Sequence, residues 1–469
     1  MNRTKAMFYN STSSFIQQIV ALVCGLIVPQ LILTTYGSAA NGTISSIGQF
    51  ISITALIQGG ITSAARVAFY EPVATSNEKK ISVVYKTCTK FFSNFAFALV
   101  VYILVLGIVF PQLIETSFHF WDCFLLVLIL GVNSIFEYLY GMSNQLLLFA
   151  DQKAFINTVA QTVCTIINAI ISICLIKIGS SLLVVKFVSA LIFILRPIFL
   201  HIYVKKRYNI DRTVQADNST LSQSKAALSK SIAFHAHTST DTLVITACMN
   251  VMWVSVYAVH KYVVGSISTL VSSVLGNTEA VFGQMYARNE KDAIEREVPI
   301  YDLLSKILST IFFVTCIILI SQFVGIYTND VEDISYHHPL FALLLCVSEM
   351  VYCMSLTYNN MIMAAGHIKE TQWISIAEAV INIVFSLLLV KTWGIIGVAI
   401  GTILAFSFNT IANIVYMRKK IYKMPLFFIM KCYLVNILAG LVAILVFGTI
   451  CYYEITNFIG FFVYAFCVF

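Results

Sequence analysis

Long apolar runs recur along the whole chain, and no other feature limits the fold as strongly. Many of these runs reach the roughly 20 residues that a helix needs to cross a bilayer. Only 11% of the residues are charged and 59% are hydrophobic, whereas about 25% of the residues in a soluble protein are charged. The sequence therefore predicts an all-α, polytopic membrane protein without a large soluble domain.

The apolar runs predict fourteen transmembrane helices. The predicted spans are 13–35, 43–65, 91–110, 124–149, 155–176, 181–204, 232–256, 262–286, 303–327, 339–364, 371–390, 394–417, 425–449 and 457–469. The first run follows Arg3 and Lys5 and is too long for the apolar core of a signal peptide. We therefore expect an uncleaved first span. The last run is shorter than a crossing needs.

The distribution of basic residues predicts the orientation of the chain. With the N-terminus in the cytoplasm, 24 of the 29 Lys and Arg lie on the cytoplasmic side, 3 in external loops and 2 deeper within spans. An excess of cytoplasmic Lys and Arg is typical of helical membrane proteins. The net charge of +7 therefore indicates topology and contact with anionic lipid headgroups. It is no argument for nucleic-acid binding.

Short segments return in the same order further along the chain. Gly42-Thr-Ile-Ser-Ser-Ile returns as Gly265-Ser-Ile-Ser-Thr-Leu, 223 residues later. Asn168 returns as Asn382, 214 residues later. This offset covers six predicted helices, an even number, so both copies have the same orientation. The sequence therefore predicts a parallel duplication.

The duplication predicts four parts of the chain. They are an N-terminal six-helix lobe over 1–205, a basic cytoplasmic linker over 206–230, a C-terminal six-helix lobe over 231–420 and an additional helix pair over 421–469. Two lobes related in this way predict a cleft that opens to one side of the membrane at a time. A channel is the competing use of such a cleft, but no segment resembles a selectivity filter.

The segment AFHAHTSTDTLVIT, residues 233–246, carries ionisable side chains at the start of a predicted span, where each is unfavourable against lipid. His237 and Asp241 are four residues apart and share a helix face, so the pair can hold a proton near neutral pH. Asp241 with the hydroxyls of Thr238 and Thr242 also suits Na⁺. A hydrogen-bond lock between the lobes, without a transport role, stays open. The spacing offers no third ligand for a metal site.

Other polar residues in or beside the spans are candidate contacts for a transported molecule. Arg66 lies at the cytoplasmic end of a span and Lys261 at an external end, whereas Glu279 lies in a polar run inside a span. Arg66 suits either a phosphate contact or an ordinary interfacial anchor. Gln17, in the first span, suits either a sugar contact or helix packing.

The sequence lacks the motifs of an enzyme. It has no Walker loop, GxSxG, HExxH or dinucleotide-binding loop, so we expect no catalytic residues and no cofactor. The twelve cysteines form no CxxC pair and lie mostly in apolar runs, which is typical of packing residues.

Several motifs resemble one family of membrane transporters. Tyr36-Gly37-x4-Gly42 follows the first span, and Asp241-Thr242-Leu-Val-Ile lies in the seventh with Val256-Tyr257 downstream. Together with the twofold six-helix plan, these motifs resemble the bacterial polysaccharide flippases of the Wzx type. That family belongs to the multidrug/oligosaccharidyl-lipid/polysaccharide exporter (MOP) superfamily. The resemblance covers essentially the whole chain.

The resemblance implies a cargo and a location. Such flippases are taken to move undecaprenyl-pyrophosphate-linked oligosaccharides from the cytoplasmic to the outer leaflet of the bacterial inner membrane. The units are then polymerised into O-antigen, capsule or exopolysaccharide, which implies a polysaccharide polymerase, glycosyltransferases and membrane lipids as partners. The resemblance places these residues around the cargo path: Gln17, Arg66, His235, His237, Asp241, Lys261 and Glu279.

The residue types match the chemistry of that cargo. A pyrophosphate is expected to bind Arg66, Lys261 and the protonated His235 and His237. Asp241 is expected to bind the coupling ion, Na⁺ or H⁺, and its occupancy then biases the protein between inward-open and outward-open states.

Three alternatives stay open. A lipid II flippase has the same plan and the additional helix pair, but it typically has arginine in the first helix, where this chain has Gln17 and Gln18. A cation-coupled drug exporter more often has twelve spans and an acidic residue in the first helix. The third alternative is a protein without coupled transport, either a structural member of a polysaccharide synthesis complex or a scramblase.

Overall fold

The computed structural model describes residues 3–450 apart from 55–61, 63–64, 67, 74, 115, 117, 212, 218–239, 276–281, 283–284 and 287–289. Within this part of the chain the regular structure is helical, and eleven helices are long and apolar enough to cross a membrane. The predicted all-α polytopic membrane fold is therefore confirmed. The chain divides into two compact units, Met1–His235 and Ala236–Phe469.

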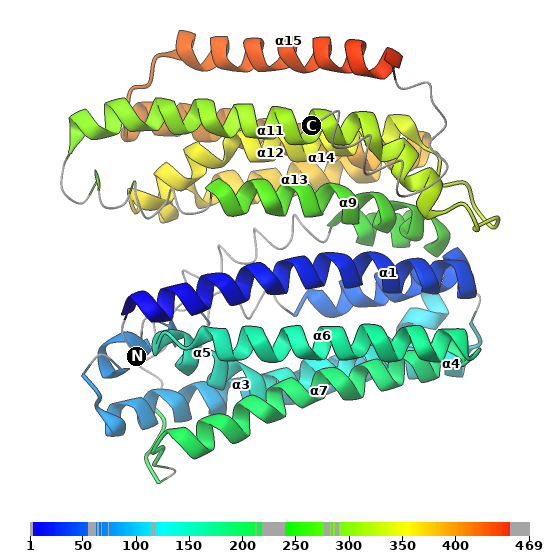
Figure 1. The fold of residues 1–469 in the computed structure, drawn as a ribbon, viewed down its shortest axis with the longest axis vertical. Helices are drawn as coiled ribbons and strands as arrows, with labels where there is room; N and C mark the ends of the chain where they lie inside the picture. Colours follow the sequence, from blue (N-terminus) through cyan, green and yellow to red (C-terminus); the bar gives the residue numbers. More distant parts are fainter. Residues whose placement is uncertain are drawn as a thin grey trace. The chain divides into compact units, whose positions relative to one another are not determined.

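The N-terminal unit is a bundle of long helices around an apolar core. Its elements are α1 (Arg3–Ser52), α3 (Glu78–Leu113), α4 (Phe120–Phe136), the π-helical turn η1 (Glu137–Gly141), α5 (Met142–Ala150), α6 (Ala154–Lys177) and α7 (Leu182–Arg207). Helix α6 packs between α1 and α7, as Figure 1 shows. Phe92, Phe110 and Leu126 lie in the core, and the outward side chains are mainly apolar, as a lipid-facing surface requires.

Gly37 lies between the first two predicted spans, 13–35 and 43–65. Helix α1 runs through it, but the backbone of Gly37 is not helical, with φ 86° and ψ 171°. Residues other than glycine rarely adopt this backbone conformation. The Tyr36 hydroxyl donates a hydrogen bond of 2.6 Å to the Ser180 carbonyl, just before α7. Gly37 therefore interrupts the helix, and Tyr36 links this interruption to the segment just before α7.

The C-terminal unit repeats this pattern of helices. Its described elements are a short helix over 240–248, α9 (Val251–Leu275), α11 (Lys291–Tyr327), α12 (Pro339–Ala364), α13 (Ile368–Trp393), α14 (Ile395–Lys420) and α15 (Leu426–Ile450). The starts of α11, α13 and α14 follow those of α3, α6 and α7 by 213 or 214 residues. The offset found between short sequence segments thus also relates whole helices.

Helices α13 and α14 pack closely because two glycines face the neighbouring helix. A methyl group at Gly397 would lie 2.4 Å from the Leu389 carbonyl oxygen. A methyl group at Gly401 would lie 2.5 Å from the Ser386 hydroxyl oxygen. Small residues allow helix backbones in membranes to approach in this way. The close approach brings the polar side chains of both helices within hydrogen-bonding distance.

The turn between the seventh and eighth predicted spans differs from the prediction. The spans 232–256 and 262–286 were expected to meet near Lys261, but the helix over 240–248 ends earlier and α9 begins at Val251. The Asn250 side chain caps α9 by accepting hydrogen bonds from the amides of Met252 and Trp253, at 3.1 and 3.2 Å. Lys261 therefore lies inside α9 and not at an external span end.

The span counts differ for three identifiable reasons. The first two predicted spans are joined in α1. The seventh overlaps the short helix over 240–248. The fourteenth, 457–469, lies outside the described residues. The four-part domain division stays a prediction.

Candidate functional site

A buried carboxylate, Asp241, is the centre of a polar cluster in the C-terminal unit. Only 4% of Asp241 is exposed. The Tyr257 hydroxyl of α9 donates to Asp241 Oδ2 at 2.9 Å. Asn382 Nδ2 of α13 donates to Asp241 Oδ1 at 3.2 Å. Thr402 Oγ1 of α14 lies 3.1 and 3.0 Å from the two carboxylate oxygens.

The cluster also contains oxygen atoms that have no partner within the described part of the chain. Asn382 is fully buried, its Nδ2 also donates to Thr402 Oγ1 at 3.1 Å, and its Oδ1 is unpartnered. The hydroxyl of Ser386, one turn further along α13, is buried and unpartnered as well. Unpartnered buried oxygens are rare in folded proteins. Together with the carboxylate, they are the hard oxygen ligands that suit a small cation.

An ion pair lies beside this cluster. Lys261 Nζ of α9 lies 2.6 Å from Glu349 Oε1 of α12. Glu349 is 8% exposed and Lys261 is 32% exposed in their side chains. The Lys261 ammonium also interacts electrostatically with Asp241. Lys261 is therefore a cation close to two buried carboxylates, Asp241 and Glu349.

A second polar network lies one helical turn along α13 from the Asp241 cluster. Asn409 Nδ2 of α14 donates to Glu378 Oε2 at 2.5 Å, and Asn413 Nδ2 donates to Asn409 Oδ1 at 2.7 Å. Glu378 and Asn382, four residues apart, thus bind different partners on α14. The network continues the polar seam between α13 and α14.

Seven of the nine predicted site residues fall into three groups. Asp241 and Thr242 are both buried in the short helix over 240–248. Lys261 lies near Asp241 and is paired with Glu349. Four candidates lie outside the described residues: His235, His237, Thr238 and Glu279. The predicted His237–Asp241 pair therefore stays a prediction.

Sequence reasoning missed the main partners of Asp241. The sequence marks Tyr257 as part of a motif and Asn382 as part of the repeat, and no sequence pattern marks Thr402. They lie 16, 141 and 161 residues from Asp241, so no local spacing connects them. The available signal was their polarity within apolar runs of the C-terminal lobe.

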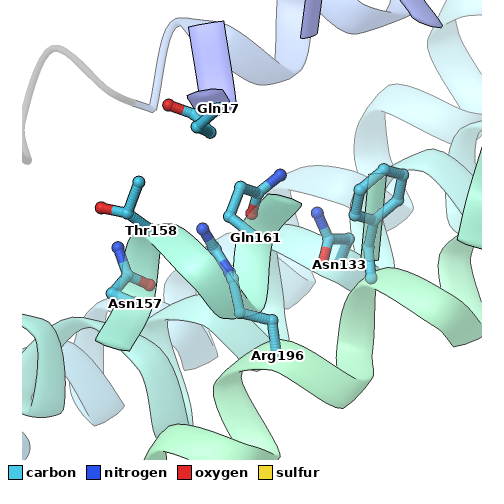
Figure 2. A pocket seen from close by; sticks show the side chains of 7 residues that line it. Gln17, Asn133, Asn157, Thr158, Gln161 and Arg196 are labelled. Atoms are coloured by element: carbon cyan, nitrogen blue, oxygen red, sulfur yellow. The ribbon is translucent and has the colours of Figure 1, made fainter. Parts of the chain in front are cut away.

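Two candidates lie in the N-terminal unit. The exposed Arg66 guanidinium lies 4.3 Å from the centre of the Phe149 ring, and no acidic partner is found for it among the described residues. Gln17 lines a polar cavity with residues of α4, α6 and α7, and Figure 2 shows its side chain beside that cavity.

No group of three or more His, Cys, Asp or Glu side chains in the described ranges could hold a metal ion. The oxygen-rich cluster around Asp241 instead suits a monovalent cation or a proton. Protonation of Asp241 and the binding of Na⁺ both neutralise its charge, so both are consistent with the same geometry.

The fold is similar to that of several solved membrane transporters. The lipid II flippase MurJ in an inward closed conformation matches with a TM-score of 0.73 at 14% identity, over 98% of this chain and 97% of that one. An inward-facing multidrug resistance transporter of the MATE family matches with a TM-score of 0.69 at 14% identity, over 87% and 98%. A MOP-superfamily transporter from Pyrococcus furiosus matches with a TM-score of 0.64 at 13% identity, over 89% and 95%.

At these identities the likeness is one of fold. No family model matches the chain, and no curated protein matches its sequence. The structural likeness therefore establishes the fold alone.

Proposed function

We propose that this protein is a flippase of the bacterial inner membrane, with its N-terminus in the cytoplasm. It moves undecaprenyl-pyrophosphate-linked oligosaccharide units from the cytoplasmic to the outer leaflet, driven by Na⁺ or H⁺. The observation that carries the coupling is the buried Asp241 carboxylate, held by Tyr257, Asn382 and Thr402 beside unpartnered oxygen atoms. A buried carboxylate inside a membrane is unfavourable unless a charge or proton compensates it.

Ion binding acts on the helices that hold the cluster. Without an ion, Asp241 depends on hydrogen bonds from α9, α13 and α14. A bound Na⁺ draws the Asp241 carboxylate and the side-chain oxygen Oδ1 of Asn382 together. A bound proton instead removes the negative charge that the hydrogen-bond donors stabilise. Either event changes the relative stability of two conformations, and an ion drives transport only through such a difference.

The cargo assignment rests on the resemblance and on charge. Arg66, with its guanidinium exposed and without an acidic partner in the described ranges, suits a pyrophosphate oxygen. His235 and His237 are proposed to add positive charge when protonated, and Glu279 and Gln17 to contact the glycan. The pairing of Lys261 with Glu349 favours a positioning role near Asp241 over a phosphate contact.

A lipid II flippase is the second candidate. The likeness in fold to MurJ extends over nearly the full length of both chains. Lipid II also contains a polyprenyl pyrophosphate, so the same cations would suit it. The two candidates differ in the glycan and its peptide, and not in the anionic group.

The test is a comparison of cargoes in proteoliposomes that contain the purified full chain. Translocation is measured separately for an undecaprenyl-pyrophosphate-linked oligosaccharide, for lipid II and for ethidium as a cationic drug. The proposal predicts gradient-dependent movement of the first at a rate well above the other two. Faster movement of lipid II would establish the second candidate, and movement of ethidium alone would indicate a drug exporter.

A further inference from the structure

A polar cavity lies inside the N-terminal unit, separate from the Asp241 cluster. Its volume is about 490 Å³, within the range of about 300–1,000 Å³ typical of small-molecule sites. Figure 2 shows six of its lining residues: Gln17, Asn133, Asn157, Thr158, Gln161 and Arg196. They come from α1, α4, α6 and α7. Phe193 of α7 contributes an aromatic ring to the lining.

The two charged side chains at this cavity, Arg196 and Glu137, neutralise each other. The Arg196 guanidinium forms an ion pair with the Glu137 carboxylate, which also accepts a hydrogen bond from Gln145. Both side chains of the pair are mostly buried, at 17% and 16% exposure. A free anion would compete with Glu137 for Arg196, and a free cation would be repelled by the Arg196 guanidinium. A neutral ligand is therefore favoured over an ion.

The backbone around Glu137 is shaped for this pair. Glu137 begins the π-helical turn η1, and π-helical turns often occur at functional sites. A methyl group added at Gly141, at the end of η1, would lie 2.7 Å from the Glu137 carboxylate. The absence of a side chain at Gly141 thus leaves room for Glu137 to fold back towards Arg196.

The side chains that line the cavity can both donate and accept hydrogen bonds. Four of its side chains are carboxamides, and each has two N–H donors and a carbonyl acceptor. Within the described part of the chain, Gln161 Nε2 has only a long contact of 3.5 Å, to Thr165 Oγ1. Hydroxyl groups donate and accept at the same time, so a polyhydroxyl ligand matches this lining.

A second cavity adjoins the first at Asn133. Its volume is about 350 Å³, and Glu137 and Tyr138 contribute to its lining. Asn133 lines both cavities, Arg196 lines the first and Glu137 the second. The ion pair thus lies where the two spaces meet. A ligand of more than one ring has room on either side of it.

We propose that this cavity pair is a glycan-binding site for one or two neutral sugar rings. Carboxamides bind the ring hydroxyls, the Arg196–Glu137 pair offers charged donors and acceptors without net charge, and Phe193 contacts an apolar ring face. The identity of the sugar-bearing ligand as a lipid-linked oligosaccharide rests on the proposed function. The binding of neutral sugar rings rests on the cavity alone.

Saturation-transfer NMR on the full chain in lipid nanodiscs tests this site. The probes are the methyl glycosides of glucose, galactose and N-acetylglucosamine, with methyl glucuronide and tetramethylammonium as charged probes. At least one neutral glycoside is expected to bind. Gln161→Leu and Gln17→Leu are each expected to weaken its binding about tenfold, the loss expected for one or two neutral hydrogen bonds. Gln18→Leu, the adjacent glutamine that is not among the lining residues, is expected to have no effect.

The other outcomes overturn the inference. Binding of a charged probe in place of the neutral ones would contradict the charge argument, and equal glycoside binding by wild type and both lining variants would place the sugar elsewhere. No binding by the wild type would mean that the cavities hold water only. Because the NMR experiment requires no transport, a chain that binds glycosides without moving lipid-linked sugar would contradict the proposed function while retaining this site.

Discussion

At the scale of single residues, Thr402 is expected to contribute directly to ion binding. Thr402→Val keeps the shape of the side chain but removes the hydroxyl that contacts both oxygens of Asp241. A hydrogen bond to a charged group contributes roughly 1.5–3 kcal/mol, so the ion concentration that half-saturates transport is expected to rise at least about tenfold. Thr410→Val is the matched control, since among the described residues the buried Thr410 hydroxyl of the same helix bonds only to the Phe406 carbonyl. An equal effect of both variants would contradict the role of Thr402.

A second residue-scale prediction concerns stability alone. Asp302 and Lys306 form a fully buried ion pair in α11, and Lys306 also bonds to the Tyr358 hydroxyl at 2.9 Å. Asp302→Ala leaves the ammonium without its counter-charge, which is expected to destabilise the protein by roughly 3–5 kcal/mol. The melting temperature in nanodiscs measures this change. The double variant Asp302→Asn with Lys306→Met is expected to recover most of the loss, and a double variant as unstable as Asp302→Ala would refute the argument.

At the scale of elements, Gly37 tests the break within α1. Its φ of 86° and ψ of 171° are accessible to glycine and strained for other residues, so Gly37→Ala is expected to reduce stability by about 1–3 kcal/mol. Gly265→Ala is the control, because that helical glycine has open space around its missing Cβ and alanine favours a helix by about 1 kcal/mol. Thermal unfolding of both variants should therefore change in opposite directions. A stable Gly37→Ala protein would show that the break is not required.

The bounds of the helices and the partners of Asp241 show how much of the structure can be predicted from the sequence. Helices such as α6 and α14 were predictable within a few residues because polar or glycine-containing turns interrupt the apolar pattern at their ends. The turn at Met249–Asn250 was not predictable, because the sequence is apolar on both sides of it. Only the cap that Asn250 provides for α9 marks the boundary between the two helices. Asp241 was predictable as a charge within an apolar run. Its partners required the close packing of α13 on α14, which depends on Gly397 and Gly401.

At the scale of the whole molecule, the proposed function links an ion to a cargo through the conformation of the protein. The Asp241 cluster joins three long helices and one short helix of the C-terminal unit, and the cavity pair lies in the N-terminal unit. Coupling requires that the ion and the cargo each prefer one of two conformations. Ion binding should therefore change the apparent affinity for the cargo, and cargo binding should change the apparent affinity for the ion by the same factor.

The proposed function requires that the charge of Asp241 couples an ion gradient to translocation. The most direct measurement compares wild type, Asp241→Asn and Glu71→Gln in proteoliposomes with a lipid-linked oligosaccharide, under an imposed sodium gradient and an imposed proton gradient. Glu71 is a surface carboxylate whose side chain is 72% exposed, so its variant serves as the control for the loss of one negative charge. The proposed coupling predicts that one gradient accelerates translocation by wild type and by Glu71→Gln, and that neither gradient accelerates translocation by Asp241→Asn. Gradient-driven translocation by Asp241→Asn at the wild-type rate would contradict it.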